Sequence, residues 1–321
     1  MTPREKFIVA LQGGQVPGRV PHFELVFYLT MEAFGRVHPS HRTFGQWDQM
    51  SKREKHLHRR DIADLYVETA RKYEHSAIFF HAPDGWGEAK TDESIATQEI
   101  IRELSGQQYC LLEHGDVTYG IPSGDKIVSF VEALADRPGE MKDNADRQVD
   151  WALGRAEKYK AAGVIDGFAL CCDYCFNNGP LLSPAMFDEF VTPYLARLTA
   201  GYREMGFYVI KHTDGNIMPI LDSLVATNPH ALHSLDPQAG VDIAEIKRRV
   251  GDRLCIIGNV NCGLMDTGSD EEVAESVRYA LSAGMPGGGY IFSTSNCIYT
   301  GMSLSRYEQM LDIWRQEGNY D

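Results

Sequence analysis

Short apolar runs alternate with longer segments of helical periodicity along most of this chain. The apolar runs lie at residues 20–27, 76–81, 167–172, 207–212, 231–235, 254–258 and 289–293. The longer segments, in which apolar residues recur every three or four positions, lie at 53–72, 145–162, 184–205, 217–227, 243–250, 270–283 and 303–317. Strands that alternate with helices are typical of a parallel α/β sheet or barrel. The pattern assigns seven strands and leaves an eighth unplaced.

Residues 89–120 interrupt this alternation. They resemble a series of short strands and turns, so we expect an inserted hairpin or meander there. No Gly-x-Gly-x-x-Gly motif follows an early strand, which favours a single (β/α)8 barrel over a doubly wound sheet. Because no linker or shift in composition divides the chain, we expect one barrel domain over residues 1–321.

The composition is that of a soluble protein with an acidic surface. The chain has 321 residues, 43% of them hydrophobic, which is enough to bury a sizeable core. It shows no run of ~18 apolar residues and no signal-peptide pattern, so we expect a cytoplasmic protein without membrane association. Its formal net charge of −14 repels nucleic acids, which we therefore do not expect as partners.

Seven cysteines suggest reduced thiols in a cytosolic protein, with metal or catalytic roles open. Cys172 and Cys175 form a Cys-x-x-Cys motif. A zinc ribbon needs a second such pair, which the chain lacks. A redox motif of this kind begins a helix in a thioredoxin-like unit, and that context is missing as well.

Polar residues gather at the carboxyl ends of the expected strands, where barrel enzymes hold their active sites. The most informative stretch is 211–216, Lys-His-Thr-Asp-Gly-Asn, which ends the run at 207–212. An isolated motif of this kind is equally compatible with a simple turn into the next helix. The candidates from all strand ends are Glu24, His81, Asp84, Asp173, His212, Asp214, Asp236, Asn259, Asn261 and residues 293–297, which include Ser293 and Cys297.

Two chemistries fit this set. In the first, His212, Asp214 and Cys297 bind a divalent metal ion, with zinc as the expected ion, and leave a position open for substrate. In the second, Asp173, Asp214 and His212 serve as general acid, base and orienting group without a metal. Spacing along the sequence does not choose between them.

Several motifs together resemble the uroporphyrinogen decarboxylase superfamily. They are Asn-Gly-Pro-Leu-Leu-Ser-Pro at 178–184, His-Thr-Asp-Gly-Asn at 212–216, Leu-Asp-Pro at 235–237, Gly-Asn-Val-Asn at 258–261 and Gly-Gly-Gly-Tyr-Ile at 287–291. Their order and spacing match through most of residues 165–300, and Arg-Val-Pro at 19–21 suits the first strand of that superfamily. The resemblance implies a distorted (β/α)8 barrel with its active-site cleft at the carboxyl ends of the strands.

The superfamily contains two broad activities, and the residues here favour one of them. The decarboxylases carry an arginine-rich N-terminal motif that pairs with substrate carboxylates, whereas residues 21–29 offer Glu24 and aromatic side chains. Methyltransferases of the thiol-methylating kind bind zinc through His-x-Cys and a distant cysteine. Here Asp214 replaces the middle cysteine, while Cys297 is retained. The chain is therefore more similar to members that take a methyl group from a small donor.

The resemblance implies an O-demethylase component that passes the methyl group of a methoxylated aromatic compound to a corrinoid (cobalamin) on a partner protein. A uroporphyrinogen-type decarboxylase and a non-catalytic corrinoid- or tetrapyrrole-binding barrel remain the alternatives, and dimers are common in the family. His212, Asp214 and Asp173 would be catalytic. The residues assigned to substrate binding are Glu24, Phe27, His81, Trp86, Asp236 and Asn259. Phe27 and Trp86 are equally compatible with a place in the core.

Overall fold

The centre of the molecule is a curled sheet of seven parallel strands in the order β1-β2-β3-β6-β7-β8-β9. The computed structural model describes residues 1–320. The strands are β1 (Ala77–Phe79), β2 (Cys110–His114), β3 (Gly167–Cys171), β6 (Tyr208–Thr213), β7 (Ala231–Ser234), β8 (Cys255–Val260) and β9 (Tyr290–Thr294). Because neighbouring strands run parallel, each connection must cross back over the sheet, and helices make these crossings.

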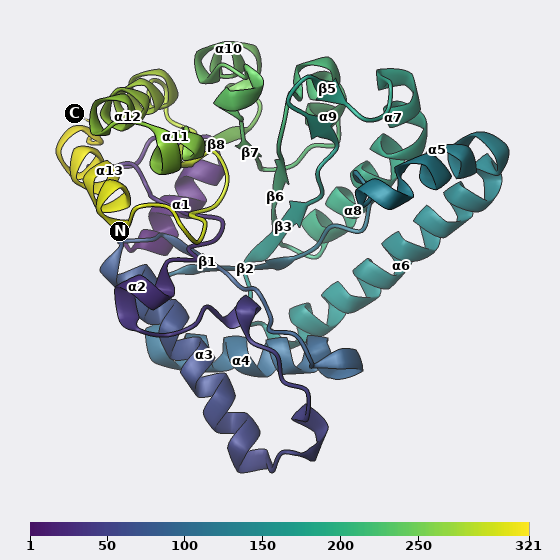
Figure 1. The fold of residues 1–321 in the computed structure, drawn as a ribbon, viewed down its shortest axis with the longest axis horizontal. Coiled ribbons are helices and arrows are strands. Elements are labelled where there is room, and N and C mark those ends of the chain that lie inside the picture. The colour runs from purple at the N-terminus through teal and green to yellow at the C-terminus, as the bar shows by residue number, and fades with distance from the viewer. Residues whose placement is uncertain (321) are drawn as a thin grey trace.

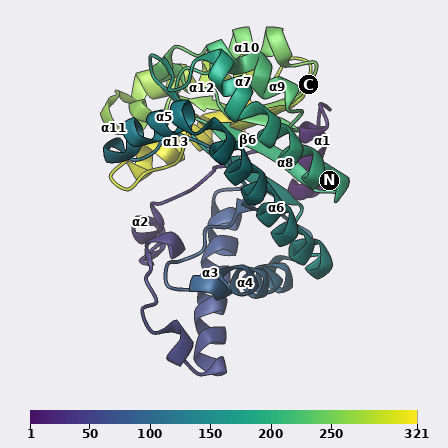
Figure 2. The same ribbon diagram turned by 90° about the vertical axis from the view of Figure 1, so that its right-hand side faces the viewer.

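Most of the helices cover the outer face of the sheet (Figure 1), whereas α1 packs against its inner face. The helices are α1 (Pro3–Leu11), α2 (Thr30–Phe34), α3 (Lys52–Lys72), α4 (Lys90–Ser105), α5 (Ile127–Asp136), α6 (Pro138–Ala162), α7 (Pro184–Phe190), α8 (Thr192–Glu204), α9 (Leu221–Ala226), α10 (Ile243–Val250), α11 (Cys262–Thr267), α12 (Asp270–Gly284) and α13 (Leu304–Glu317). Figure 2 shows α3 and α4 below the other helices, with α2 beside them. No helix within residues 1–320 has the length and apolar character needed to cross a membrane.

The gap between the edge strands β1 and β9 is filled by residues 20–24, where we expected a regular first strand. His22 forms isolated parallel bridges with His75 and with Phe292, so this segment touches both edges. The Ser76 amide donates to the His22 carbonyl at 2.7 Å, and the Phe23 amide donates to the Phe292 carbonyl at 3.0 Å. Pro21 has no amide hydrogen to donate, which explains why the pairing stays irregular. The α/β fold is thus confirmed as a curled parallel sheet, with an irregular segment at its seam.

The prediction of an inserted hairpin or meander at residues 89–120 is wrong. This region folds as a regular helix, α4, followed by the strand that the sequence left unplaced, β2. The buried face of α4 includes Ser94, Thr97 and Gln98, so its helical periodicity is hidden among polar residues. Strand β2 ends in Glu113 and His114, which gives it the appearance of a surface turn.

Two of the expected helices are interrupted. The expected helix at 184–205 breaks between α7 and α8 at Val191, two residues before Pro193. The expected helix at 217–227 begins as the 3-10 turn Met218–Ile220 and becomes the short α9. A small antiparallel hairpin, β4 (Cys175–Phe176) with β5 (Gly179–Pro180), follows β3. A Cβ atom on Gly215 would lie 2.4 Å from the Cys175 carbonyl oxygen, so the turn after β6 packs directly against this hairpin.

The inside of the curled sheet is filled by side chains that include Ala77, Cys110, Ala169, Ala231 and Cys255. The apolar face of helix α1 joins this cluster through Phe7, Ala10 and Leu11 and covers one end of the lumen. A separate and larger cluster lies between the sheet and its helices. This end of the lumen is therefore apolar, whereas His81, His212 and Asn259 lie at the opposite end, where the strands finish.

Candidate functional site

A polar layer lies directly above the apolar filling of the sheet. Side chains two positions apart on a strand share a face, so the residue two places after each inward apolar side chain also points inward. The inward apolar residues are Phe79, Leu112, Ala169, Ile210, Ala231, Ile257 and Ile291. Their successors on the same face are His81, His114, Cys171, His212, His233, Asn259 and Ser293. Because side chains alternate between the two faces of each strand, four histidines point inward at the strand ends.

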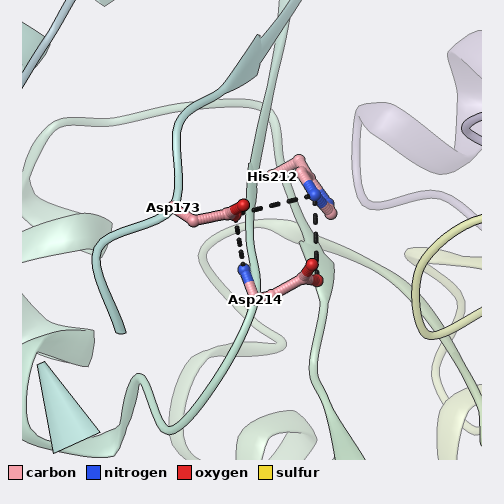
Figure 3. A group of neighbouring side chains, drawn as sticks. All are labelled: Asp173, His212 and Asp214. Carbon is pink, nitrogen blue, oxygen red and sulfur yellow. Dashed lines mark hydrogen bonds and ion pairs between the residues drawn. The ribbon is translucent and has the colours of Figure 1, made fainter. Parts of the chain in front are cut away.

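Three groups converge at the centre of this layer, as Figure 3 shows. His212 is the penultimate residue of β6, Asp173 follows β3 and Asp214 follows β6. One side-chain ligand atom from each lies within 4.8 Å of the others. The Nε2 atom of His212 lies 3.7 Å from Asp214 Oδ1 and 3.9 Å from Asp173 Oδ1. These separations are too long for direct hydrogen bonds.

Both carboxylates are held in place by their neighbours. The Asp214 amide donates to Asp173 Oδ1 at 3.0 Å, which ties the two loops together. Asn296 donates through Nδ2 to Asp214 Oδ2. The other oxygen, Asp214 Oδ1, is buried and has no hydrogen-bond partner within residues 1–320. A buried acceptor without a donor is costly, so this oxygen marks a place for a proton or a cation.

Burial and mutual repulsion govern the ionisation of the cluster. Burial, reinforced by the nearby Asp173 and Asp236 charges, raises the pKa of Asp214 to about 7. Burial also lowers the pKa of His212, so its ring is neutral at physiological pH. Asp214 therefore exchanges a proton near neutrality, as a general acid requires.

A buried ion pair supports the cluster from below. The Lys211 ammonium lies 2.7 Å from Asp116 Oδ2, and it also donates to the carbonyls of Leu170 and Cys172 at 3.1 and 3.0 Å. Burial acts to raise the pKa of Asp116, but the Lys211 charge and the hydrogen bonds from Lys211 and Thr118 together outweigh it, and the net pKa is lowered. Lys211 thereby fixes the chain on both sides of the β3 end, directly before Asp173.

The three clustered groups have the geometry and donor types of a divalent cation site. Imidazole nitrogen and carboxylate oxygen each bind zinc at about 2.0–2.2 Å, so two ligands of one ion lie no more than ~4.2 Å apart. The separations of 3.7 and 3.9 Å meet this limit. The atom Asp214 Oδ1, which has no other partner, faces the same point. Asp173, His212 and Asp214 therefore fit such an ion.

Cys297, which we expected as the third metal ligand, is not part of this three-residue group within residues 1–320. It is buried, and burial raises the pKa of its thiol well above the usual value. The Asp214 charge acts in the same direction, so Cys297 lies near the cluster. Asp173 is the third member of the group, in the role that we expected for Cys297.

The remaining predicted residues divide between the mouth and the core. The His81 ring lies 4.5 Å from the His114 ring, centroid to centroid, in the polar layer. The Asp236 carboxylate accepts from the Gln238 amide at 2.9 Å, and Asn259 donates to the Leu235 carbonyl at 2.8 Å.

The two aromatic candidates are buried. Phe27 packs on Tyr73 and Tyr307, and Trp86 packs on Trp47. Phe27 is 4% exposed and Trp86 is 2% exposed, and both belong to the larger hydrophobic cluster. They take the core position that the sequence also allowed.

Sequence reasoning named Ser293 among the residues at the strand ends but missed His114 and His233. His233 pairs with His212 in the register of β6 and β7, and the two Nδ1 atoms lie 2.8 Å apart. The signal was available, because each of these residues lies two positions after an inward apolar residue. It depended on knowing which face of each strand points inward.

Solved structures share this architecture. A methyltransferase from Methanosarcina mazei is 17% identical, covers 99% of both chains and superposes with a TM-score of 0.72. A putative vitamin-B12 independent methionine synthase from Listeria monocytogenes is 12% identical, covers 94% of this chain and 96% of its own, and has a TM-score of 0.50. At these identities the likeness shows a common fold.

Curated relatives add a sequence relationship. A uroporphyrinogen decarboxylase from Thioalkalivibrio sulfidiphilus is 27% identical over 150 residues, which is 44% of this chain and 40% of the relative. Another from Shewanella loihica is 28% identical over 131 residues, 38% of this chain and 34% of the relative. The chain thus matches less than half the length of these relatives. The family model described as uroporphyrinogen decarboxylase (URO-D) matches residues 142–317, more than half of the chain, and the protein belongs to this family.

Proposed function

We propose that this protein is a methyltransferase that moves a methyl group from a small methylated donor, a methoxylated aromatic compound, to a corrinoid carried by a partner protein. The observation that carries the proposal is the cluster of Asp173, His212 and Asp214 at the end of the lumen. It combines a neutral imidazole with a carboxyl group that exchanges its proton near pH 7. Cleavage of an ether bond needs such a group beside the departing oxygen.

The charge of the site argues against the decarboxylation named for the curated relatives. A substrate with many carboxylates needs arginine or lysine groups to bind it. Within residues 1–320, neither Asp173 nor Asp214 forms an ion pair with an arginine or lysine, and the ring that lies near both acids, His212, is neutral. The Asp236 carboxylate adds a further acid close to Asp214. A polyanionic substrate would be repelled there, whereas a neutral ether would not.

The chain's own residues account for the proton that the reaction requires. As the C–O bond breaks, both bonding electrons stay on the oxygen, and the methyl carbon is taken up by the reduced corrinoid. The oxygen then needs a proton, which Asp214 holds because burial raises its pKa to about 7. The Asp214 amide donates to Asp173 and the Asn296 amide donates to Asp214 Oδ2, and these two contacts orient Asp214.

In the alternative chemistry, Asp214 is ionised and, together with Asp173 and His212, would hold a divalent cation, for which zinc is our proposal; the ion would then take the place of the Asp214 proton. When bound there, such an ion supplies a Lewis acid for the donor oxygen. Two carboxylates and one imidazole form a harder ligand set than thiolates do, so they suit an oxygen-containing donor better than a thiol.

The test is to incubate the protein with a panel of methoxylated aromatics and a reduced corrinoid protein, and to follow the absorbance change of corrinoid methylation. We expect turnover in the wild type and a decrease of at least ~100-fold in His212→Ala and Asp214→Asn. Asp222→Asn is the matched control, because Asp222 is 78% exposed and pairs only with Arg249 on the surface. It should leave turnover unchanged.

Two other outcomes would contradict the proposal. Loss of carboxyl groups from uroporphyrinogen, without methyl transfer from any donor in the panel, would favour a decarboxylase. A corrinoid absorbance change that needs no methyl donor and survives His212→Ala and Asp173→Ala would favour a non-catalytic corrinoid-binding barrel.

A further inference from the structure

Behind His212, a chain of buried hydrogen bonds crosses the lumen to the seam of the sheet. His212 Nδ1 lies 2.8 Å from His233 Nδ1, and His233 Nε2 lies 3.3 Å from Ser293 Oγ. Ser293 Oγ lies 3.5 Å from Glu24 Oε2, and Glu24 Oε1 lies 3.2 Å from His22 Nε2. All five side chains are buried. This hydrogen-bond chain connects His212 to residues that the mechanism above does not use.

The donor and acceptor roles along this hydrogen-bond chain are fixed at its far end, at His22. His22 Nδ1 lies 3.0 Å from the Tyr73 carbonyl oxygen, which can only accept, so Nδ1 must carry a hydrogen. Burial lowers the pKa of His22 to about 3, so the ring is neutral and its Nε2 atom can only accept. Glu24 Oε1 must therefore donate to it, which requires a protonated carboxyl group. The pKa of Glu24, raised by burial to about 8, agrees with this protonation.

The second carboxyl oxygen of Glu24, Oε2, determines the donor and acceptor roles of Ser293 and His233. Because the acid proton is on Oε1, Oε2 accepts from the Thr294 hydroxyl at 2.5 Å and from the Ser293 hydroxyl at 3.5 Å. A serine hydroxyl has one hydrogen, so Ser293 then accepts from its other neighbour, His233 Nε2. This leaves His233 Nδ1 without a hydrogen.

Between two Nδ1 atoms 2.8 Å apart, one must donate and the other accept. We propose that His22, Glu24, Ser293 and His233 are positioning residues that hold His212 in the tautomer with its hydrogen on Nδ1. The lone pair of His212 Nε2 then faces Asp173 Oδ1 and Asp214 Oδ1. Three acceptors converge on one point, which is the arrangement that a divalent cation requires. The opposite direction would place a hydrogen on Nε2 and make His212 a donor to the carboxylates.

This inference rests on the site proposed above, but its test does not depend on methyl transfer. In metal-free protein with 15N-labelled histidine, NMR distinguishes a protonated from an unprotonated ring nitrogen. The signals of His212 are identified by their loss in His212→Gln. We expect a protonated Nδ1 and an unprotonated Nε2 in the wild type near pH 7.

Two substitutions test whether the chain sets this tautomer. In Glu24→Gln the side-chain amide can donate to His22 while its oxygen accepts from Ser293 and Thr294, so the tautomer of His212 should be unchanged. Ser293→Ala removes the link, so the hydrogen should shift toward His212 Nε2 and Zn²⁺ affinity by calorimetry should fall about 10–100-fold. Ser282→Ala, at an exposed serine whose hydroxyl donates only to the Tyr279 carbonyl, is the matched control.

The inference is overturned by a hydrogen on Nε2 in the metal-free wild type, by an unchanged tautomer in Ser293→Ala, or by a changed one in Glu24→Gln. If Ser293→Ala does not fold, the wild-type and Glu24→Gln spectra still decide. The expected tautomer together with absent methyl transfer would reject the proposed function and leave this inference standing.

Discussion

At the scale of single residues, burial of Asp214 keeps a proton available near neutral pH and lowers the free energy of unfolding above that pH. Its pKa is raised from an ordinary 3.8 to about 7, chiefly by burial. The folded protein therefore holds this proton more tightly than the unfolded chain does, and the associated stability is lost as pH rises from about 4 through 7. Above pH 7 the folded state must contain a largely buried carboxylate.

Asp214→Asn should remove this cost. We expect the metal-free variant to be about 2 kcal/mol more stable than the wild type at pH 8, a value discounted for the 26% exposure of the side chain, and equally stable at pH 4. Urea unfolding followed by circular dichroism at both pH values is the measurement. A variant less stable than the wild type at pH 8 without metal would show that Asp214 is stabilised by contacts rather than strained by burial.

Site residues could be predicted from the sequence where a recognisable turn motif follows a strand. His212 and Asp214 stand in a short motif whose polar types and glycine are visible without a structure. His233 lies between the apolar residues Leu232 and Leu235, with Ser234 beside it, and nothing local shows that its ring meets another histidine. The meeting depends on the register between β6 and β7, which tertiary packing decides.

At the scale of elements, the Lys211–Asp116 ion pair joins β6 to the loops after β2 and β3. Both side chains are almost fully buried, at 0% and 4% exposure. Lys211→Met should leave Asp116 as an unpaired buried charge and lower the free energy of unfolding by about 3–5 kcal/mol. Lys211→Met with Asp116→Asn removes both charges and should recover part of that loss. Denaturant unfolding of both variants checks this, and equal losses would show that packing of Lys211, rather than charge pairing, is what matters.

Elements were predictable from sequence where their buried faces are apolar. The periodicity at 243–250 matches α10 to the residue, because its inward positions are Ile243, Ile246 and Val250. Helix α4 buries polar residues instead, among them Gln98, whose amide donates to Glu113 at 2.7 Å. A hydrogen bond of this kind satisfies a buried polar side chain, but it leaves no apolar period for sequence analysis to detect. The tertiary partner, Glu113 on β2, was missed for the same reason.

At the scale of the whole molecule, residues 18–20, which lead into the seam, are bound by residues 314–320. The Val20 amide donates to the Gly318 carbonyl at 2.8 Å, and the Tyr320 amide donates to the Gly18 carbonyl at 2.9 Å. Trp314 of α13 donates through Nε1 to the Val20 carbonyl at 3.1 Å and stacks on Phe292 of β9. The segment that carries His22 and Glu24 is therefore held by the C-terminal helix. The C-terminal helix α13 thus holds the segment whose residues His22 and Glu24 form the far end of the hydrogen-bond chain behind the site.

Trp314→Ala should open this seam. The indole is 3% exposed, so its removal should cost about 3–5 kcal/mol of stability, and Trp314→Phe, which keeps a ring against Phe292, should cost less. Phe187→Ala is the control, because Phe187 is equally buried but packs on Tyr174, away from the seam. Hydrogen exchange should accelerate at the Phe23 and Phe292 amides in Trp314→Ala and remain slower in Phe187→Ala. Equal acceleration in both variants would mean that the seam opens only when the whole molecule unfolds, and that α13 stabilises the fold without closing the sheet.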